Sequence, residues 1–252
     1  MIKVFGKIFE VLETVIVESP NPVTPMVIAE RLGMNRPTCS RILRDLTDAG
    51  YLTHVSRQAG YAAGPRSYTF AGMVRYKTRM LDKARPYVKD CAFKHSKSLL
   101  FCERSGMDRY ILCHYNYSTL NIHLKQFSYR DLFETATGMV LLAYATRPEQ
   151  EEAYRFYREN GLYFFPEMTD FSILAKEFDR IRRERIFIRD KFRTLQWIAA
   201  VPVCKNGIVI AALGLSAPAA DVGNGEREML AGELKKTAFA ISNELSTIES
   251  IG

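Results

Sequence analysis

Residues 35–52, NRPTCSRILRDLTDAGYL, constrain the fold of the first third of the chain more than any other segment. Ile42, Leu43 and Leu46 recur at helical spacing, which places three apolar side chains on one face. Gly50 provides a C-terminal stop, and an aromatic and β-branched run follows it. Small polar and basic residues remain on the other face. The segment therefore predicts a short helix that docks on a core and keeps a polar face outward.

Two more helices and a hairpin are predicted around this segment. Residues 3–17 have apolar side chains at every third or fourth position, and residues 25–32 follow a Thr-Pro helix start. After the third helix, YLTHVSRQAGYAAG contains two short strand-like runs around the turn-prone SRQAG. Three helices and a hairpin in this order describe a winged helix-turn-helix. The pattern predicts a DNA-binding domain over residues 1–66.

The third helix and the hairpin tip supply the candidate DNA contacts. In a helix-turn-helix the second helix of the motif enters the major groove, where Arg reads guanine and Ser or Thr hydroxyls reach bases or phosphates. The candidate residues are Arg36, Thr38, Ser40, Arg41 and Arg44 on the helix and Arg57 at the tip of the hairpin. Residues 1–66 have a net charge of only +2. A dimerisation or interaction module therefore stays open as the alternative to DNA binding.

The positive charge of the chain is concentrated in its first half. The net charge is +7, of which residues 67–130 contribute +8, whereas residues 131–252 contribute −3. This distribution fits a polyanionic partner such as double-stranded DNA. A solvated basic face explains such a bias about equally well.

Several other classes of protein are disfavoured. The first residues place charges among their apolar positions, unlike a signal peptide, and no apolar run approaches the roughly 18 residues of a membrane span. A soluble, cytoplasmic protein is expected. The five cysteines lack CxxC spacing, which indicates reduced thiols and no metal or cofactor. There is no GxSxG, HExxH or phosphate-binding glycine loop, so an enzyme is not expected.

The rest of the chain is predicted as a basic linker helix and a second domain. Residues 67–85 form the linker, Pro86 breaks the helix, and residues 86–252 form the domain. Strands are predicted at SLLFCERS, RYILCHYN, IFIRDKF, QWIAAVPV and GIVIAALGLSAP, with a further candidate at STLNIHLKQ. The turn CKNG joins the last two strands as a hairpin. Strands in hairpins with flanking helices predict an α+β fold with a largely antiparallel sheet.

The sequence resembles the IclR family of bacterial transcription regulators over nearly its full length. The resemblance rests on VIAERLGMNRPTCSRILRDLTDAGYL, GYAAG and PRSYTFAG in the first part, and on LFETATGMVLLAYA, TDFSILAKEFDRIRRERIFIRD, WIAAVPV and GIVIAALGLSAP in the second. It implies a winged helix, a linker helix and an effector-binding domain of GAF-like fold, working as a homodimer or homotetramer on a near-palindromic operator. The recognition motif of the family falls on residues 36–43.

The resemblance also implies a site for a small effector on one face of the sheet. The implied residues are Ala136, Thr137 and Gly138 at a helix start, Arg189 and Asp190 at a strand end, Gln196 and Ile198 on the opposite wall, and Gly214 and Ser216 on the last strand. Backbone N–H groups at the helix start suit a carboxylate.

Three departures from the family pattern bear on the effector. Met139 stands where the family usually has lysine, Ile186-Phe187 stand where it usually has Gly-Tyr, and residues 189–193 are basic where it is usually acidic. The basic and aromatic rim favours an anionic or aromatic metabolite. A solvated, salt-bridged rim is the alternative at this point. The departures also keep open an architectural DNA-binding or protein-interaction module with a vestigial pocket.

Overall fold

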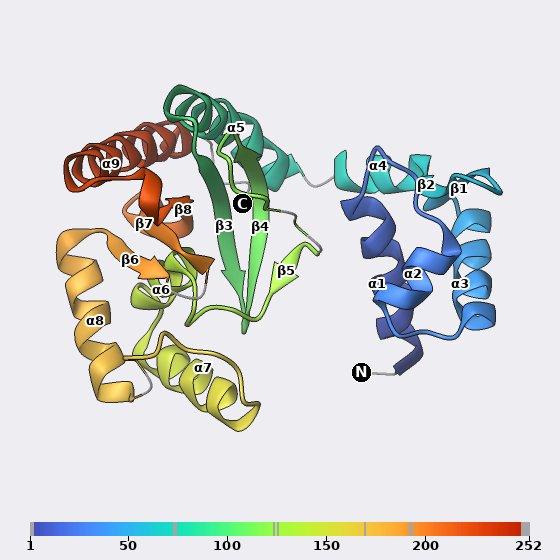
Figure 1. The fold of residues 1–252 in the computed structure, drawn as a ribbon, viewed down its shortest axis with the longest axis horizontal. Helices are drawn as coiled ribbons and strands as arrows, with labels where there is room; N and C mark the ends of the chain where they lie inside the picture. Colours follow the sequence, from blue (N-terminus) through green and yellow to red (C-terminus); the bar gives the residue numbers. More distant parts are fainter. Residues whose placement is uncertain are drawn as a thin grey trace. The chain divides into compact units, whose positions relative to one another are not determined.

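The computed structural model describes residues 3–72, 75–122, 124, 126–168, 170–191 and 194–247 (Figure 1). The chain divides into two compact units. The N-terminal unit comprises Met1–Thr78 and His123–Phe127, and the C-terminal unit comprises Arg79–Ile122 and Ser128–Gly252. Each unit is described separately below.

The N-terminal unit has the predicted order of three helices and a hairpin. Its elements are α1 (Lys3–Val17), α2 (Pro25–Arg31), α3 (Arg36–Asp48), β1 (Leu52–Ser56), β2 (Gly60–Ala63) and α4 (Pro65–Gly72). Two side chains start the helices of the motif, as Thr24 accepts from the Val27 N–H and Asn35 accepts from the Thr38 N–H at 3.0 Å. The predicted winged helix-turn-helix is confirmed as the fold of this unit.

A small apolar core joins the helices of this unit to its hairpin. The buried residues are Val11, Val15, Val23, Ile28, Ala29, Cys39, Ile42, Leu43, Leu46 and Leu52. Strands β1 and β2 pair antiparallel, and Val23 adds a bridge to Tyr61 of β2. Gly60 makes this bridge possible, because its φ is +94° and a Cβ there would collide with the Val23 carbonyl. The hairpin is therefore fixed to the start of α2.

The predicted break at Pro86 is wrong. Helix α5 (Arg75–His95) continues through Pro86. Proline removes one helical hydrogen bond, but Met80, Ala84, Val88 and Ala92, spaced by four residues, are all buried and hold the turns on both sides. The boundary between the compact units, Thr78/Arg79, also lies inside α5.

The C-terminal unit is built on one antiparallel sheet. Its strands are β3 (Ser98–Ser105), β4 (Asp108–Asn116), β5 (Ser128–Tyr129), β6 (Phe187–Lys191), β7 (Gln196–Lys205) and β8 (Ile208–Pro218), in the order β5-β4-β3-β8-β7-β6. Asn206 and Gly207 turn β7 into β8 with φ of 51° and 81°, as a tight hairpin requires. The predicted α+β class with an antiparallel sheet is confirmed.

The prediction of a strand at STLNIHLKQ, residues 118–126, is wrong for the residues that the structure describes. Residues 118–122 are not a strand, and residues 123 and 125 lie outside the described residues. Asn116 explains the local conformation, because its side chain donates to the Leu120 carbonyl at 2.7 Å and accepts from the Ser118 N–H at 3.1 Å. These bonds compete with strand pairing.

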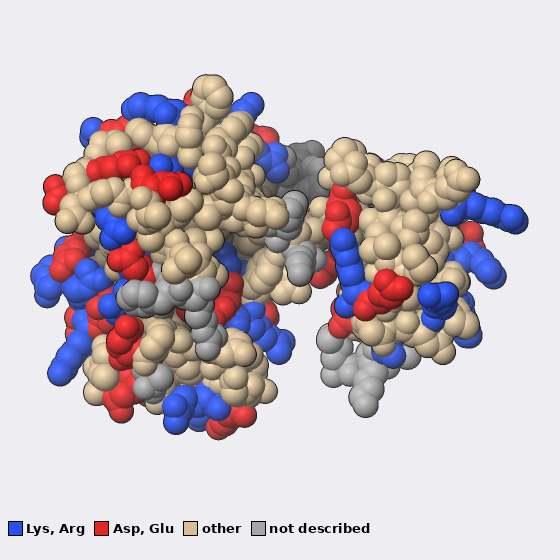
Figure 2. All heavy atoms as spheres, viewed as in Figure 1, with Lys and Arg blue, Asp and Glu red and all other residues tan. Residues whose placement is uncertain are grey.

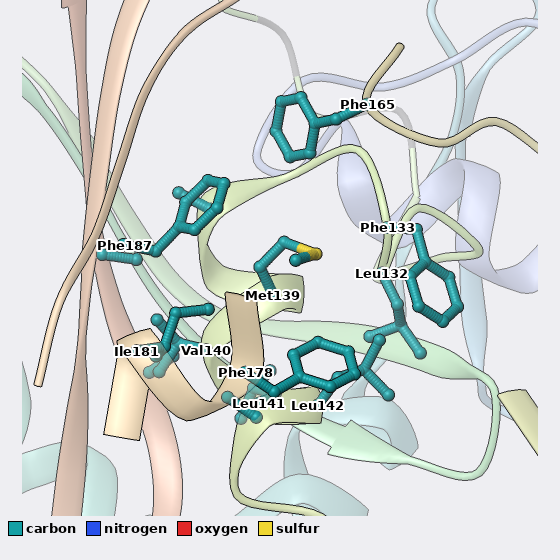
Figure 3. Close-up of a cluster of buried hydrophobic side chains, with 14 of the residues drawn as sticks. Leu132, Phe133, Met139, Val140, Leu141, Leu142, Phe165, Phe178, Ile181 and Phe187 are labelled. Carbon is teal, nitrogen blue, oxygen red and sulfur yellow. The ribbon is translucent and has the colours of Figure 1, made fainter. Parts of the chain in front are cut away.

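Helices cover both faces of the sheet (Figure 1). One face holds α6 (Ala136–Ala143), α7 (Arg147–Glu159) and α8 (Phe171–Glu184), and the other holds α5 and α9 (Asn224–Ser246); a short 3-10 helix, η2 (Ala219–Asp221), precedes α9. All eight residues of α6 are buried. Side chains from α6, α8 and β6 gather around Met139 in the core (Figure 3). No described helix is both long and apolar enough to span a membrane.

Candidate DNA-binding surface and ligand cavity

Helix α3 presents its predicted contact residues on the side away from the core. Cys39, Ile42, Leu43 and Leu46 are buried, whereas Arg36, Arg41 and Arg44 are exposed, with Thr38 and Ser40 half-buried. Basic side chains project from the side of the unit that carries α3 and the β1–β2 hairpin (Figure 2). The sequence therefore divides α3 into a docking face and a solvent face as expected.

The cations of this surface have no ion-pair partner among the described residues. This holds for Arg36, Arg41 and Arg44 on α3 and for Arg57, which is exposed in the turn between β1 and β2. In contrast, Arg31 of α2 pairs with Glu18 at 2.5 Å. Guanidinium groups without a partner keep their donors available for phosphates and base edges.

The C-terminal unit contains a cavity of about 170 Å³ between α6 and the sheet. It is lined by Leu100, Arg109, Ile122, Thr135, Ala136, Thr137, Gln196, Ile198, Ala199, Gly214, Leu215 and Ser216. Six of the nine residues implied by the resemblance are among them: Ala136, Thr137, Gln196, Ile198, Gly214 and Ser216. The structure thus brings together three segments that are far apart in the sequence.

The start of α6 supplies hydrogen-bond donors to this cavity. Thr135 is the N-cap, since its Oγ1 accepts from the Gly138 N–H at 3.2 Å and donates to the Asp131 carbonyl at 3.0 Å. The N–H groups of Ala136 and Thr137 have no acceptor within the helix. Their position on the cavity wall suits an anionic group of a ligand.

Gly214 lets α6 approach the sheet. A Cβ at this position would lie 2.5 Å from Cγ2 of Thr137. Its neighbour on the same face, Ser216, is 8% exposed and faces the cavity without a hydrogen-bond partner among the described residues. The alternation of β8 therefore places one small residue under the helix and one hydroxyl beyond it.

Arg109 of β4 is a lining residue that sequence reasoning missed. It is 4% exposed and donates to both carboxylate oxygens of Asp131, at 2.8 and 2.5 Å. It also contacts Sγ of Cys102 at 3.2 Å. Because the Asp131 carbonyl accepts from Oγ1 of Thr135, the α6 cap, Arg109 holds the segment that leads into that helix. Nothing in RYILCHYN distinguishes an inward arginine from an outward one.

Three implied effector residues do not line the cavity. Gly138 packs against the backbone of Leu132, where a Cβ would clash. Arg189 lies on the edge strand β6 opposite Ile198, outside the lining. Asp190 is opposite Trp197, on the face that packs on α9, and its Oδ2 accepts from Nη1 of Arg227 at 3.1 Å. Adjacent strand residues point to opposite faces, so Arg189 and Asp190 cannot both serve one site.

Two cysteines of the sheet, Cys102 of β3 and Cys113 of β4, are poor nucleophiles. Burial raises the pKa of the Cys102 thiol and raises the pKa of the Cys113 thiol to about 12. At neutral pH both are thiols rather than thiolates. The geometry therefore offers binding chemistry at the cavity, with no activated thiol.

These features define a class of protein: a winged helix-turn-helix unit joined to an α+β unit that contains a small cavity. The family model that matches the sequence is described as the MarR family and covers residues 11–60, from α1 to the start of β2. No protein of curated function matches the sequence.

Solved structures share this fold along nearly the whole chain. An IclR homolog from Microbacterium hydrocarbonoxydans, complexed with 4-hydroxybenzoate, is 18% identical, with a TM-score of 0.75 over 97% of this chain and 100% of that one. The IclR of Thermotoga maritima is 19% identical, with a TM-score of 0.67 over 98% and 100%. An IclR transcriptional regulator from Alicyclobacillus acidocaldarius is 18% identical, with a TM-score of 0.71 over 97% and 99%. The resemblance to the IclR family is confirmed at the level of the fold.

Proposed function

We propose that the protein is a ligand-responsive transcription regulator rather than an enzyme. The observation that carries the proposal is the solvent face of α3, where Arg36, Arg41 and Arg44 are exposed and have no described ion-pair partner. Such a helix, docked through its apolar face, suits the major groove of DNA. Thr38 and Ser40 add hydroxyl donors, and Arg57 of the wing adds a phosphate or minor-groove contact. The solved structures of the same fold include regulators of the IclR type, which supports this function.

The effector is proposed to be a small carboxylic acid. The free N–H groups at the start of α6 suit its carboxylate, and the apolar walls suit a ring or short aliphatic body. The cavity of about 170 Å³ is smaller than the roughly 300–1,000 Å³ of typical ligand pockets, which favours a molecule with a single ring. The Microbacterium homolog complexed with 4-hydroxybenzoate supports an aromatic acid as the class.

We assign one function to each of the three segments that the sequence predicts. Residues 1–66 bind the operator, residues 67–85 link and dimerise the protomers, and residues 86–252 sense the effector in the cytoplasm. A dimer presents two α3 helices, so its operator is near-palindromic. A tetramer adds a second pair of α3 helices. An effector shifts the population of DNA-competent protein only through its different affinity for the two states.

Selection from a random duplex library tests the DNA-binding function. The full chain is expected to enrich one near-palindromic sequence and to bind it a thousandfold or more tighter than a shuffled duplex. Arg41→Ala should lose most of this preference, whereas Lys7→Ala, an exposed cation on α1, should keep it. Salt-sensitive binding without enrichment would favour an architectural DNA binder. No binding at low salt would favour an interaction module.

A thermal-shift panel tests the sensor function. Benzoate, 4-hydroxybenzoate, succinate and acetate are compared with the corresponding primary amides at equal concentration. An acid that binds the folded cavity raises the melting temperature, and raises it further as its concentration exceeds its dissociation constant, whereas its amide does not. A chain that responds to none of the acids would contradict this effector class and favour a vestigial pocket.

A further inference from the structure

Two hollows lie along α9, away from the cavity beneath α6. One, of about 530 Å³, is bordered by the end of α8, by β7 and by the β7–β8 hairpin. The other, of about 540 Å³, is bordered by β6, by Trp197 and by the start of α9. Lys235 lines both. We call the two together the α9 groove; in Figure 1, β6 lies between α8 and α9.

One stripe of α9 forms the wall of this groove. Its residues are Asn224, Glu228, Ala231, Lys235, Phe239 and Ser242, separated by three or four positions and hence on one helical face. The adjacent face carries Leu230, Leu234 and Ile241, which are buried against the sheet. The stripe is therefore not part of the core. It spans roughly 27 Å at 1.5 Å per residue, a length that suits a stretch of polypeptide rather than a single-ring metabolite.

The wall is held in place by the hairpin beside it. Ser242 accepts from the Cys204 N–H at 2.9 Å, and Ser246 accepts from the Asn206 N–H at 3.5 Å. These bonds join α9 to β7 and to the turn that follows it. The groove is thus formed before any partner binds, which reduces the ordering cost of binding.

Large apolar side chains are exposed at the groove. Phe239 of α9 is 69% exposed and lines the hollow near α8. Ile208, which follows the lining residue Gly207, is also 69% exposed. An exposed aromatic side chain that lines a hollow is a frequent anchor of protein interfaces.

The charge of the same hollow is positive. Arg185 and Lys235 have no ion-pair partner among the described residues, and the neighbouring acid, Glu184, is paired with Arg180 at 2.6 Å and with Arg183 at 3.2 Å. In the second hollow, Arg227 is paired with Asp190. The unpaired charge next to Phe239 is thus cationic, and it is complementary to an acidic segment.

We propose that the α9 groove binds an acidic segment of a partner protein, with a large apolar side chain of that segment against Phe239 and its carboxylates near Lys235 and Arg185. The cavity beneath α6 and the α3 surface take no part in this site. A regulator with such a groove contacts a second protein while its N-terminal unit holds DNA.

Peptide display on the purified full chain tests the proposal. A library of random 12-residue peptides is selected on the wild type and counter-selected on Lys235→Glu/Phe239→Ser. We expect enrichment of peptides rich in Asp and Glu that contain a Phe, Trp or Leu. For the best synthetic peptide, fluorescence anisotropy should show at least tenfold weaker binding to Lys235→Glu and to Phe239→Ala. Lys236→Glu, the same charge reversal one residue along α9 but outside the groove, should change binding less than twofold.

Four outcomes would overturn it. Enriched peptides without acidic character, or no peptide whose binding depends on the two substitutions, would remove the acidic segment as the occupant. Equal weakening by Lys236→Glu would show a diffuse charge effect. Sedimentation velocity gives the fourth: if the Lys235→Glu/Phe239→Ser variant is monomeric where the wild type is an oligomer, a second copy of the chain occupies the groove instead. Unchanged melting temperatures of the variants confirm that each is folded.

Discussion

Arginines stand on the solvent face of α3 and in the wall of the α6 cavity, but in opposite environments. Arg41 is exposed and has no ion-pair partner among the described residues, whereas Arg109 is 4% exposed and bonded to both oxygens of Asp131. The first keeps its donors for a partner molecule. The second holds the chain before α6 in position. From this difference in pairing we expect Arg41 to act in recognition and Arg109 to act in holding the fold.

The largest effect is expected from breaking the buried pair. Arg109→Met leaves the Asp131 carboxylate without its partner, which should lower the free energy of unfolding of the C-terminal unit by about 3–5 kcal/mol. Chemical denaturation measures this change. Arg130→Met is the matched control, because Arg130 pairs with Asp108 at 3.2 Å on the surface and should contribute at most about 1 kcal/mol. Equal losses in both variants would show that burial does not distinguish the two pairs.

The next largest loss of stability is expected at Gly138, which packs against backbone near the start of α6. Gly138→Ala places a methyl group against the Leu132 backbone and should destabilise the unit by about 1–3 kcal/mol, as overpacking does. Gly232→Ala of α9 meets no atom within 4 Å and should stabilise it by up to about 1 kcal/mol. The melting temperatures of both variants, measured by thermal unfolding, are compared with that of the wild type. A stabilising Gly138→Ala would mean that α6 has room to shift on the sheet.

On the α3 surface the expected change is in binding rather than in stability. If Arg41 contacts a base, Arg41→Ala should weaken binding to the selected operator by about 1–3 kcal/mol relative to binding to a shuffled duplex. Its unfolding free energy should stay within about 0.5 kcal/mol of the wild type because the side chain is exposed. Anisotropy titrations and denaturation on the same preparation separate the two quantities. A loss of stability with unchanged operator preference would show that Arg41 supports the fold and does not read the operator.

The same contrast explains which parts of the sites follow from the sequence. The α3 surface is contained in residues 35–48, so helical periodicity alone separates Ile42, Leu43 and Leu46 from the exposed arginines. Strand alternation is also local, so the sequence alone puts Gly214 and Ser216 on one face of β8, and both line the cavity. The prediction put Asp190 in one site with Arg189, whereas the same alternation directs the two side chains to opposite faces of the sheet. It missed Arg109 because the direction of that side chain depends on the β3–β4 register, which shifts between Phe101 and Cys102.

Pro86 illustrates a different limit. A proline within a helical pattern predicts a break, and the local cost of the missing hydrogen bond is real. That cost is offset by the burial of Ala84 and Val88 on both sides, and how deeply they are buried is decided by the tertiary fold. The boundary between the two compact units accordingly falls within α5 rather than at its proline.

The smallest expected effect tests whether the cavity recognises its ligand with a neutral hydroxyl as well as with the N–H groups of α6. Ser216→Ala removes a hydroxyl that faces the cavity and has no described partner, so the protein loses no internal hydrogen bond. Its melting temperature should therefore be unchanged, whereas its affinity for an acid that stabilises the wild type should fall by about 1 kcal/mol, or roughly fivefold. Calorimetric titration measures the affinity, with Ser105→Ala at the exposed end of β3 as the control. Equal affinity in the wild type and in Ser216→Ala would limit ligand recognition to the helix start and the apolar walls. The α6 N–H groups would then be the polar groups that contact the ligand, as the α3 arginines are proposed to contact DNA.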